Sequence, residues 1–159
     1  MNNFSEVEKA YIAGFLDGDG SVYVKLTKNK SYKFRYQVSA YISFYQSQSK
    51  NQFLEEIQKK FGCGYLRKRK DGISEFILGD EESQIKFIEM ISPYSKLKKK
   101  QLQLMKKILN GKKKVKTAND FLKICALVDE YRLLNYSKKR KVLTKEVRKT
   151  LKKEGLITP

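Results

Sequence analysis

Strict alternation of side chains over residues 34–45 is the feature that most constrains the fold of this chain. Successive side chains of a β-strand point to opposite faces, so the segment is predicted to be a long strand with one buried and one solvated face. The apolar face carries Phe34, Tyr36, Val38, Ala40, Ile42 and Phe44. The polar face carries Arg35, Gln37, Ser39, Tyr41, Ser43 and Tyr45. Residues 21–27 have the same period, and the break at residues 28–31 predicts an antiparallel hairpin.

Helical patterns and a second hairpin follow. Residues 48–61 have helical spacing and end at Gly62, and strands are predicted on either side of Asp71-Gly72, at 65–70 and 73–78. Pro93 and Gly111 are expected to separate the first three of the later helices, which are predicted at 81–92, 97–109, 118–135 and 144–154. The sequence therefore predicts a single α+β domain over residues 1–159, ordered αββαββα, with additional C-terminal helices and an antiparallel sheet covered on one face.

The first helical segment carries carboxylates at its glycine-rich end. Ser5 and Glu8 have the spacing of a capping box, and Gly18 and Gly20 predict the helix end, which leaves Asp19 just beyond the C-terminus. The partial negative charge of a helix C-terminus repels a bare carboxylate and attracts a cation. Asp19 is therefore expected to hold a hard divalent cation such as Mg²⁺.

One face of the same helix is predicted to lack bulky side chains, and the opposite side to face a core. The small face comprises Ala10, Ala13, Gly14 and Asp17, and the core side comprises Tyr11, Ile12, Phe15 and Leu16. A helical glycine costs ~1 kcal/mol relative to alanine, so Gly14 indicates a close approach of another backbone. The expected partner is the same helix of a second subunit, and two-fold symmetry would bring two Asp19 carboxylates together. Two roles stay open for Asp17, a structural or interface role and direct support of the metal site.

Composition favours a nucleic-acid partner. Lysine and arginine total 35 against 17 acidic residues, giving a net charge of +18, although a ribosomal or anionic-membrane protein could share this balance. Histidine is absent, which excludes histidine-containing zinc sites and histidine-assisted nucleophilic triads. The two cysteines, Cys63 and Cys125, are expected to be buried thiols. No signal peptide or membrane-spanning run is recognisable, so neither secretion nor membrane insertion is expected.

The segment Ile12–Gly20 resembles the motif of the LAGLIDADG homing endonucleases, and Ser21–Leu26 is similar to its continuation in the single-motif, homodimeric, intron-encoded members. The resemblance covers roughly residues 5–135. It extends through Ser31–Phe34, the region of Gln46, Gly62–Tyr65, Pro93–Gln101 and Asp120–Lys123. It implies metal-dependent cleavage of both strands of a long pseudo-palindromic DNA site across the minor groove, leaving short 3′ overhangs. Intron mobility would be the biological outcome. The lysine-rich composition favours an AT-rich coding genome, such as that of a chloroplast or mitochondrion.

The same resemblance implies the residues of an active site. Asp19, Gln46, Lys50 and Lys98 fall on catalytic positions, and the backbone carbonyl of Gly18 falls on a metal-ligand position. Mg²⁺ or Mn²⁺ is the implied metal. Lys98 is implied to act on the attacking water or on the transition-state charge. Some relatives have arginine at the position of Lys50, and a lysine there keeps the charge without the bidentate fork.

The polar faces of the hairpins are expected to bind double-stranded DNA, because a two-stranded ribbon fits the major groove. The expected contacts are Tyr23, Lys25, Thr27, Asn29, Ser31, Tyr32, Arg35, Gln37, Ser39, Tyr41, Ser43, Tyr45, Arg67, Arg69, Glu75 and Ile77. Lys138 and Lys139 are expected to bind phosphates. The alternative is that the polar sheet face and the lysine clusters are solvated and bind no ligand.

Two other functions use the same scaffold. An RNA-binding maturase would assist splicing of the intron, and a regulator would bind DNA without cutting it. The presence of Asp19, Gln46 and Lys98 argues against a pure loss of catalysis. The target sequence does not follow from the side chains, because they fix neither the docking register nor the bending of the DNA.

Overall fold

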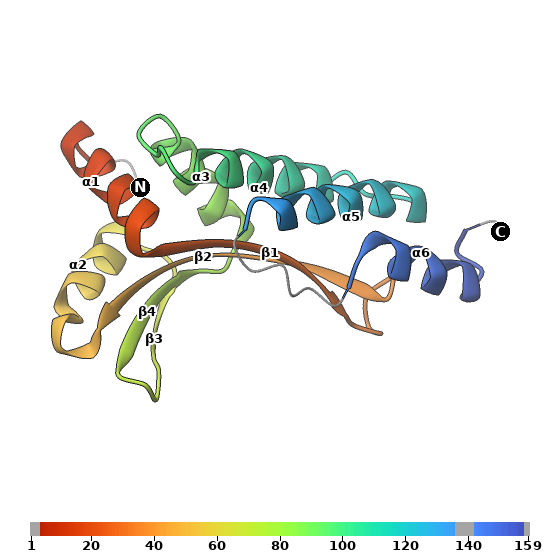
Figure 1. Cartoon of the computed structure of the whole chain (residues 1–159), viewed down its shortest axis with the longest axis horizontal. Helices are drawn as coiled ribbons and strands as arrows, with labels where there is room; N and C mark the ends of the chain where they lie inside the picture. The colour runs from red at the N-terminus through yellow and green to blue at the C-terminus, as the bar shows by residue number, and fades with distance from the viewer. Residues whose placement is uncertain (1–3, 136–141, 158–159) are drawn as a thin grey trace. The chain divides into compact units, whose positions relative to one another are not determined.

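The computed structural model describes residues 4–135 and 142–157 (Figure 1). The predicted order of helices and strands is confirmed in this part of the chain. Its elements are α1 (Glu6–Asp19), β1 (Gly20–Lys28), β2 (Tyr36–Ser47), the short 3₁₀ helix η1 (Gln48–Lys50), α2 (Gln52–Phe61), β3 (Tyr65–Lys68), β4 (Ile73–Leu78), α3 (Glu81–Ile91), α4 (Lys99–Lys112), α5 (Ala118–Leu133) and α6 (Thr144–Lys153). None of the helices in these ranges is long and apolar enough to cross a membrane.

The four strands form one sheet in the order β1-β2-β4-β3. β2 and β4 are antiparallel, with Ile42 opposite Leu78 and Gln46 opposite Ser74. β3 and β4 form the second predicted hairpin, which turns at Gly72, a glycine with φ of 80°. The α+β class with an antiparallel sheet is therefore confirmed.

The chain forms two compact units. The first unit comprises Met1–Tyr23 and Ala40–Gln103, and the second comprises Val24–Ser39 and Leu104–Pro159. An aromatic cluster fills the core of the first unit, where the ring of Phe44 lies 5.8 Å from that of Phe87 and 6.1 Å from that of Phe76. In the second unit the rings of Phe34 and Phe121 stack at 5.2 Å.

The alternation predicted over residues 34–45 is confirmed on its apolar face. All six apolar side chains are at most 8% exposed. On the polar face, Ser39 and Ser43 are also buried, contrary to the expectation of a fully solvated surface. For Ser43 the reason is its cross-strand neighbour, because the bulkier Ile77 lies directly opposite on the same face.

Three of the differences between predicted and observed boundaries have a clear physical reason. β2 begins at Tyr36 because Arg35 has a left-handed φ of 63°, which interrupts the extended backbone. α1 continues through Asp19, so Asp19 is its last residue and Gly20 is the cap. Gly111 does not end α4; it lets α5 approach, since a Cβ there would lie 2.7 Å from the Cδ1 of Ile124.

Candidate functional site

The C-terminal end of α1 presents an exposed carboxylate. The capping box of Ser5 and Glu8 begins the helix as predicted, and the N–H of Gly20 donates to the carbonyl of Leu16 at its end. Asp19 and Gly18 are exposed, and the last turn of α1 contains no basic residue. Within the described ranges no hydrogen bond to the Asp19 side chain is seen. The helix dipole and this carboxylate together make the end of α1 attractive to a cation.

Asp17 serves a different purpose from Asp19. Its Oδ1 accepts hydrogen bonds from the hydroxyl of Ser95 at 2.7 Å and the N–H of Lys98 at 3.1 Å. Its Oδ2 accepts from the N–H groups of Lys96 at 2.6 Å and Leu97 at 3.0 Å. Burial raises the pKa of Asp17, but the hydrogen bonds from Leu97, Ser95, Lys96 and Lys98 outweigh it and hold the pKa below its usual range. Because both oxygens are occupied, Asp17 has the structural role of holding residues 95–98 against α1.

Lys98 lies beside the end of α1 as a result. Its Nζ donates to the backbone carbonyl of Asp17 at 2.5 Å. Burial lowers the pKa of Lys98, and the negative charges of Asp17 and Asp19 partly offset this effect. The fold thus brings together Asp19 and Lys98, which are about 80 residues apart in the sequence.

Gln46 and Lys50 lie close together in the sequence, where β2 leads into η1. Gln46 lies near the end of β2, and its Oε1 accepts from the N–H of Ser47 at 3.0 Å. Lys50 is exposed in η1. No bond within the described residues joins either side chain to Asp19 or Lys98.

The end of α1 offers oxygen donors of the kind that a hard metal ion prefers, but few of them. The Asp19 carboxylate and the Gly18 carbonyl are the hard oxygen donors that Mg²⁺ prefers. In the described part of the chain, no group of three or more Asp, Glu or Cys side chains is placed to hold a metal ion. Among the described residues, one copy of the chain therefore offers the Asp19 carboxylate and the Gly18 carbonyl as donors at the end of α1.

The exposed face of α1 differs from the predicted one. Ala13 is fully buried, so its assignment to a subunit interface is wrong, and Tyr11 is 60% exposed instead of facing the core. The exposed stripe is Val7, Ala10, Tyr11, Gly14 and Gly18. A Cβ on Gly14 would meet no atom of the described residues within 4 Å beyond its own helix, so no described neighbour requires a glycine there.

The polar sheet face of the first unit is organised around a buried glutamate. Glu75 is 3% exposed and lies opposite both Tyr45 and Arg67 in the sheet. Its Oε2 accepts from the Nε of Arg67 at 2.6 Å, and its Oε1 lies 3.3 Å from Nη1 of Arg69. Arg69 also pairs with Asp71 at 2.6 Å. Glu75 therefore orients two guanidinium groups, a role that strand patterning did not reveal.

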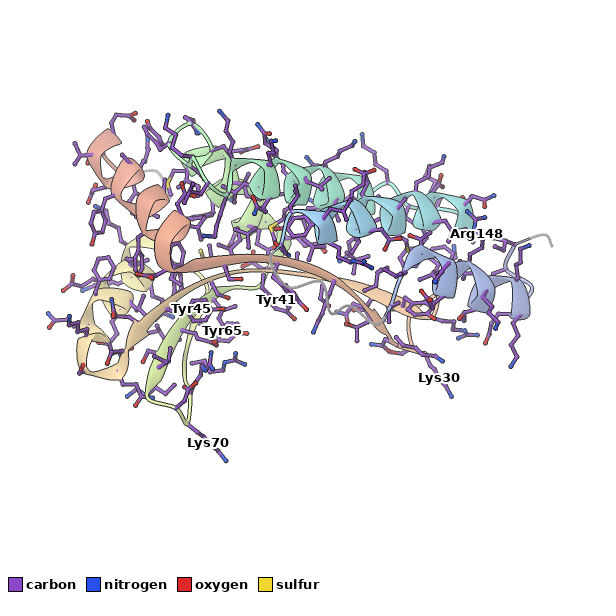
Figure 2. All side chains as sticks on the ribbon, in the orientation of Figure 1. Lys30, Tyr41, Tyr45, Tyr65, Lys70 and Arg148 are labelled. Atoms are coloured by element: carbon purple, nitrogen blue, oxygen red, sulfur yellow. The ribbon has the colours of Figure 1, made fainter. Side chains whose placement is uncertain are left out.

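The other expected DNA contacts on this face differ in their exposure. Tyr41, Tyr45 and Tyr65 lie on one side of the sheet, and Lys70 lies at the tip of the β3–β4 hairpin (Figure 2). Ile77 is only 4% exposed, so the expectation that it forms part of an open reading surface is wrong. It packs between Ser43 and Tyr65, its cross-strand neighbours.

In the second unit, the end of the β1–β2 hairpin carries the remaining expected contacts. The Oδ1 of Asn29 accepts from the hydroxyl of Ser31 at 2.6 Å, while Lys25, Thr27, Tyr32 and Gln37 are partly or fully exposed. The Nε of Arg35 donates to Glu154 at 3.0 Å. Sequence patterning missed Glu154, because no local spacing links a C-terminal helix to a hairpin 119 residues away. Lys138 and Lys139 lie outside the described residues.

The sequence of this chain is similar to those of known proteins. A family model described as LAGLIDADG endonuclease matches residues 12–109. The chain is 37% identical over 142 residues to the DNA endonuclease I-CreI of Chlamydomonas reinhardtii, covering 89% of this chain and 86% of that protein. It is 34% identical over 154 residues to the DNA endonuclease I-CvuI of Chlorella vulgaris, covering 97% of this chain and 96% of that protein.

Solved structures share the fold over nearly the whole chain. I-CvuI in complex with the I-CreI DNA target and Mg, with the DNA not cleaved, matches with a TM-score of 0.91 at 34% identity, covering 96% of this chain and 98% of that one. The archaeal intron-encoded homing endonuclease I-Vdi141I, complexed with DNA, has a TM-score of 0.84 at 19% identity, covering 96% and 99%, which is a likeness of fold alone. The matched motif, the relatives and the shared fold establish that this chain belongs to the LAGLIDADG endonuclease family.

Proposed function

We propose that this chain is a site-specific homing endonuclease that hydrolyses both strands of a long pseudo-palindromic DNA site across the minor groove, leaving short 3′ overhangs. The observation that carries the proposal is that the ammonium of Lys98 binds the backbone carbonyl of Asp17 at the end of α1, two residues before the exposed carboxylate of Asp19. Family membership supplies the reaction class, and the net charge of +18 suits a polyanionic substrate.

The proposed roles follow from the chemistry of each group. Asp19 and the Gly18 carbonyl would hold Mg²⁺ or Mn²⁺, and such an ion activates water and neutralises charge that develops on a phosphoryl group. Lys98 places a positive charge next to the reacting phosphate, where it stabilises the transition state. Gln46 orients water through its amide, and Lys50 adds an electrostatic contribution from η1.

A homodimer completes the proposed site. The exposed stripe of α1 presents Gly14, where a second backbone can approach closely because no side chain intervenes. A C2 pair of α1 helices would place two Asp19 carboxylates near the shared axis, which supplies the donors that one chain lacks.

Sequence recognition is proposed to come from the hairpins. Arg67 and Arg69 are the proposed guanine readers, and Glu75 holds them in a fixed orientation, which favours bidentate contacts in the major groove. The intron-homing role would place the gene in an organelle genome, in line with the algal relatives and the lysine-rich composition.

Cleavage of selected DNA is the decisive experiment. Wild-type protein selects duplexes from a randomised library, and the enriched duplex is then incubated with the protein plus Mg²⁺, Mn²⁺ or a chelator. Metal-dependent double-strand cleavage is expected from wild type and not from Asp19→Asn. Binding without cleavage by wild type would identify a DNA-binding regulator. Tight binding to the host intron RNA in place of duplex DNA would identify a maturase.

A further inference from the structure

A cleft of about 460 Å³ in the second unit lies between the end of the β1–β2 hairpin and α6. Among the described residues of the expected DNA-binding set, only Arg35 lines it. Thr150 also contributes to the lining, and the charged side chains are five cations and one carboxylate. They are Lys28, Lys30, Arg35, Lys149, Lys153 and Glu154.

The charges of this cleft are unbalanced. Arg35 pairs with Glu154, with Nη2 to Oε2 at 3.0 Å, so the carboxylate is already engaged. The four lysines form no ion pair with any residue in the described ranges. Four like charges around one cleft repel one another, and an anion bound between them would remove that repulsion.

The position of α6 is fixed by contacts on its other faces. Val147 and Leu151 are fully buried, and the hydroxyl of Thr150 lies 2.9 Å from that of Tyr36 in β2. Lys149 and Lys153 are spaced i, i+4, so both project from the same side of the helix. These contacts hold α6, and with it the two lysines, against the hairpin.

We propose that this cleft binds the phosphodiester backbone of the DNA duplex, beyond the bases that the β1–β2 hairpin reads. The inference rests on the proposed function, because it extends the DNA-binding surface of the same enzyme. Among the described residues no aromatic or apolar side chain lines the cleft, so these residues offer nothing on which a base could stack. Lysine ammonium groups bind phosphates as point charges, which gives affinity without sequence preference.

The β1–β2 hairpin connects the cleft to residues that are expected to contact bases. Lys28 directly follows Thr27, an expected base contact in β1, and Lys30 lies at the end of the hairpin (Figure 2). DNA that follows β1 towards this end would present its backbone to α6. The cleft would thereby lengthen the footprint of each subunit on the duplex.

The test compares two double variants on one helix. Lys149→Ala with Lys153→Ala removes two charges from the cleft. Arg148→Ala with Lys152→Ala removes two charges from α6 outside the cleft, and Arg148 extends from α6 on the side away from Lys30 (Figure 2). All four side chains are exposed, so both variants are expected to keep the thermal midpoint of the wild type. Affinities are measured over a salt series for the selected duplex, a scrambled duplex and a selected duplex shortened at both ends.

The cleft variant is expected to weaken binding to the selected and scrambled duplexes equally. Its plot of log affinity against log salt should be shallower by roughly 2 to 4 units, since each phosphate contact contributes about 0.9 and a dimer has two clefts. The control variant should keep the wild-type slope, and the difference between the variants should vanish on the shortened duplex. Equal slopes for the two variants on the full duplex would overturn the cleft proposal while leaving cleavage, and hence the proposed function, intact.

Lysine acetylation of the wild-type protein gives a second readout that needs no variant. Bound duplex is expected to protect Lys28, Lys30, Lys149 and Lys153 from an amine-reactive reagent, with Lys152 as the unprotected control. Failure of duplex to protect the cleft lysines in a protein that still cleaves would overturn the proposal. Protection by RNA alone, in a protein that neither binds nor cleaves duplex, would overturn both the cleft proposal and the proposed function.

Discussion

The ammonium of Lys98 donates a hydrogen bond of 2.5 Å to the backbone carbonyl of Asp17, two residues before the exposed carboxylate of Asp19. This contact joins the segment before α4 to the end of α1. The carboxylate of Asp17 makes the same connection through four further hydrogen bonds. The two aspartates of the motif therefore have different roles. Asp17 positions Lys98, and Asp19 is left open for a ligand.

Asp17→Asn is expected to lower the stability of the chain, whereas Asp19→Asn is expected to abolish cleavage. Asp17→Asn loses charge-assisted hydrogen bonds and should lower the free energy of unfolding by about 2 kcal/mol in urea titrations. Asp19→Asn removes an exposed carboxylate without such bonds. It should keep wild-type stability and DNA affinity while cleavage is lost. Wild-type cleavage rates in Asp19→Asn would refute its role as a metal ligand.

Acid should remove the stability that Asp17 contributes. The pKa of Asp17 in the folded chain is lowered from its ordinary 3.8, so its contribution is complete above that value. It is lost as pH falls through the lower, folded pKa. The difference in unfolding free energy between wild type and Asp17→Asn should therefore be constant from pH 7 to about 5 and shrink below pH 4. A difference that stays constant down to pH 2 would contradict this assignment.

Cleavage should decline in alkali because of Lys98. Burial lowers its pKa from the ordinary 10.5, so the ammonium loses its proton at a lower pH than an exposed lysine does. Single-turnover rates at saturating DNA should fall on the alkaline side before pH 10.5 is reached. Lys98→Arg keeps the charge and should move this decline to higher pH, while DNA affinity stays constant over the same range. An identical alkaline limb in Lys98→Arg would exclude Lys98 as its source.

The strands and helices could be predicted from the sequence because local physics fixes them. The alternation over residues 34–45 permits only a two-faced strand, and the Ser5–Glu8 capping box sets the start of α1 wherever the helix packs. The errors arose where tertiary contacts decide. Gly111 continues α4 because α5 packs against it, and β2 starts late because the hairpin holds Arg35 in a left-handed conformation.

Less of the candidate site than of the fold could be predicted from the sequence. Family resemblance indicates Asp19 and Lys98, but only the structure shows that Asp17 holds Lys98 at the end of α1. Ala13 and Tyr11 were assigned to the wrong faces of α1, because the helix is bordered by elements whose positions no spacing rule supplies. The pairing of Arg35 with Glu154 likewise depends on a contact between distant segments.

Glu75 is expected to control the specificity of the β3–β4 hairpin. Arg67→Ala should relax discrimination of one base pair in each half-site by roughly tenfold to a hundredfold, as the loss of a bidentate guanine contact would. Glu75→Gln leaves Arg67 and Arg69 without their shared carboxylate and should relax the same base pair and its neighbour. Lys70→Ala, at the hairpin tip, is the control and should weaken binding without changing base preference. Library selection with each variant measures the effect, and enriched sites without dyad symmetry would contradict the symmetric dimer.

The dimer proposal is tested by two glycines of α1 that have opposite environments. The Cβ that Gly14→Leu adds would meet no atom within 4 Å among the described residues outside its own helix, so the folded monomer should keep its stability. The bulk should force two α1 helices apart, and sedimentation is expected to show a monomer that no longer cleaves. Gly20→Ala is the matched contrast, because its Cβ would lie 2.5 Å from Cδ1 and 2.8 Å from Cα of Leu16. It should lower the thermal midpoint of the chain itself. A Gly14→Leu protein that remains dimeric and fully active would show that the exposed stripe of α1 does not join the subunits.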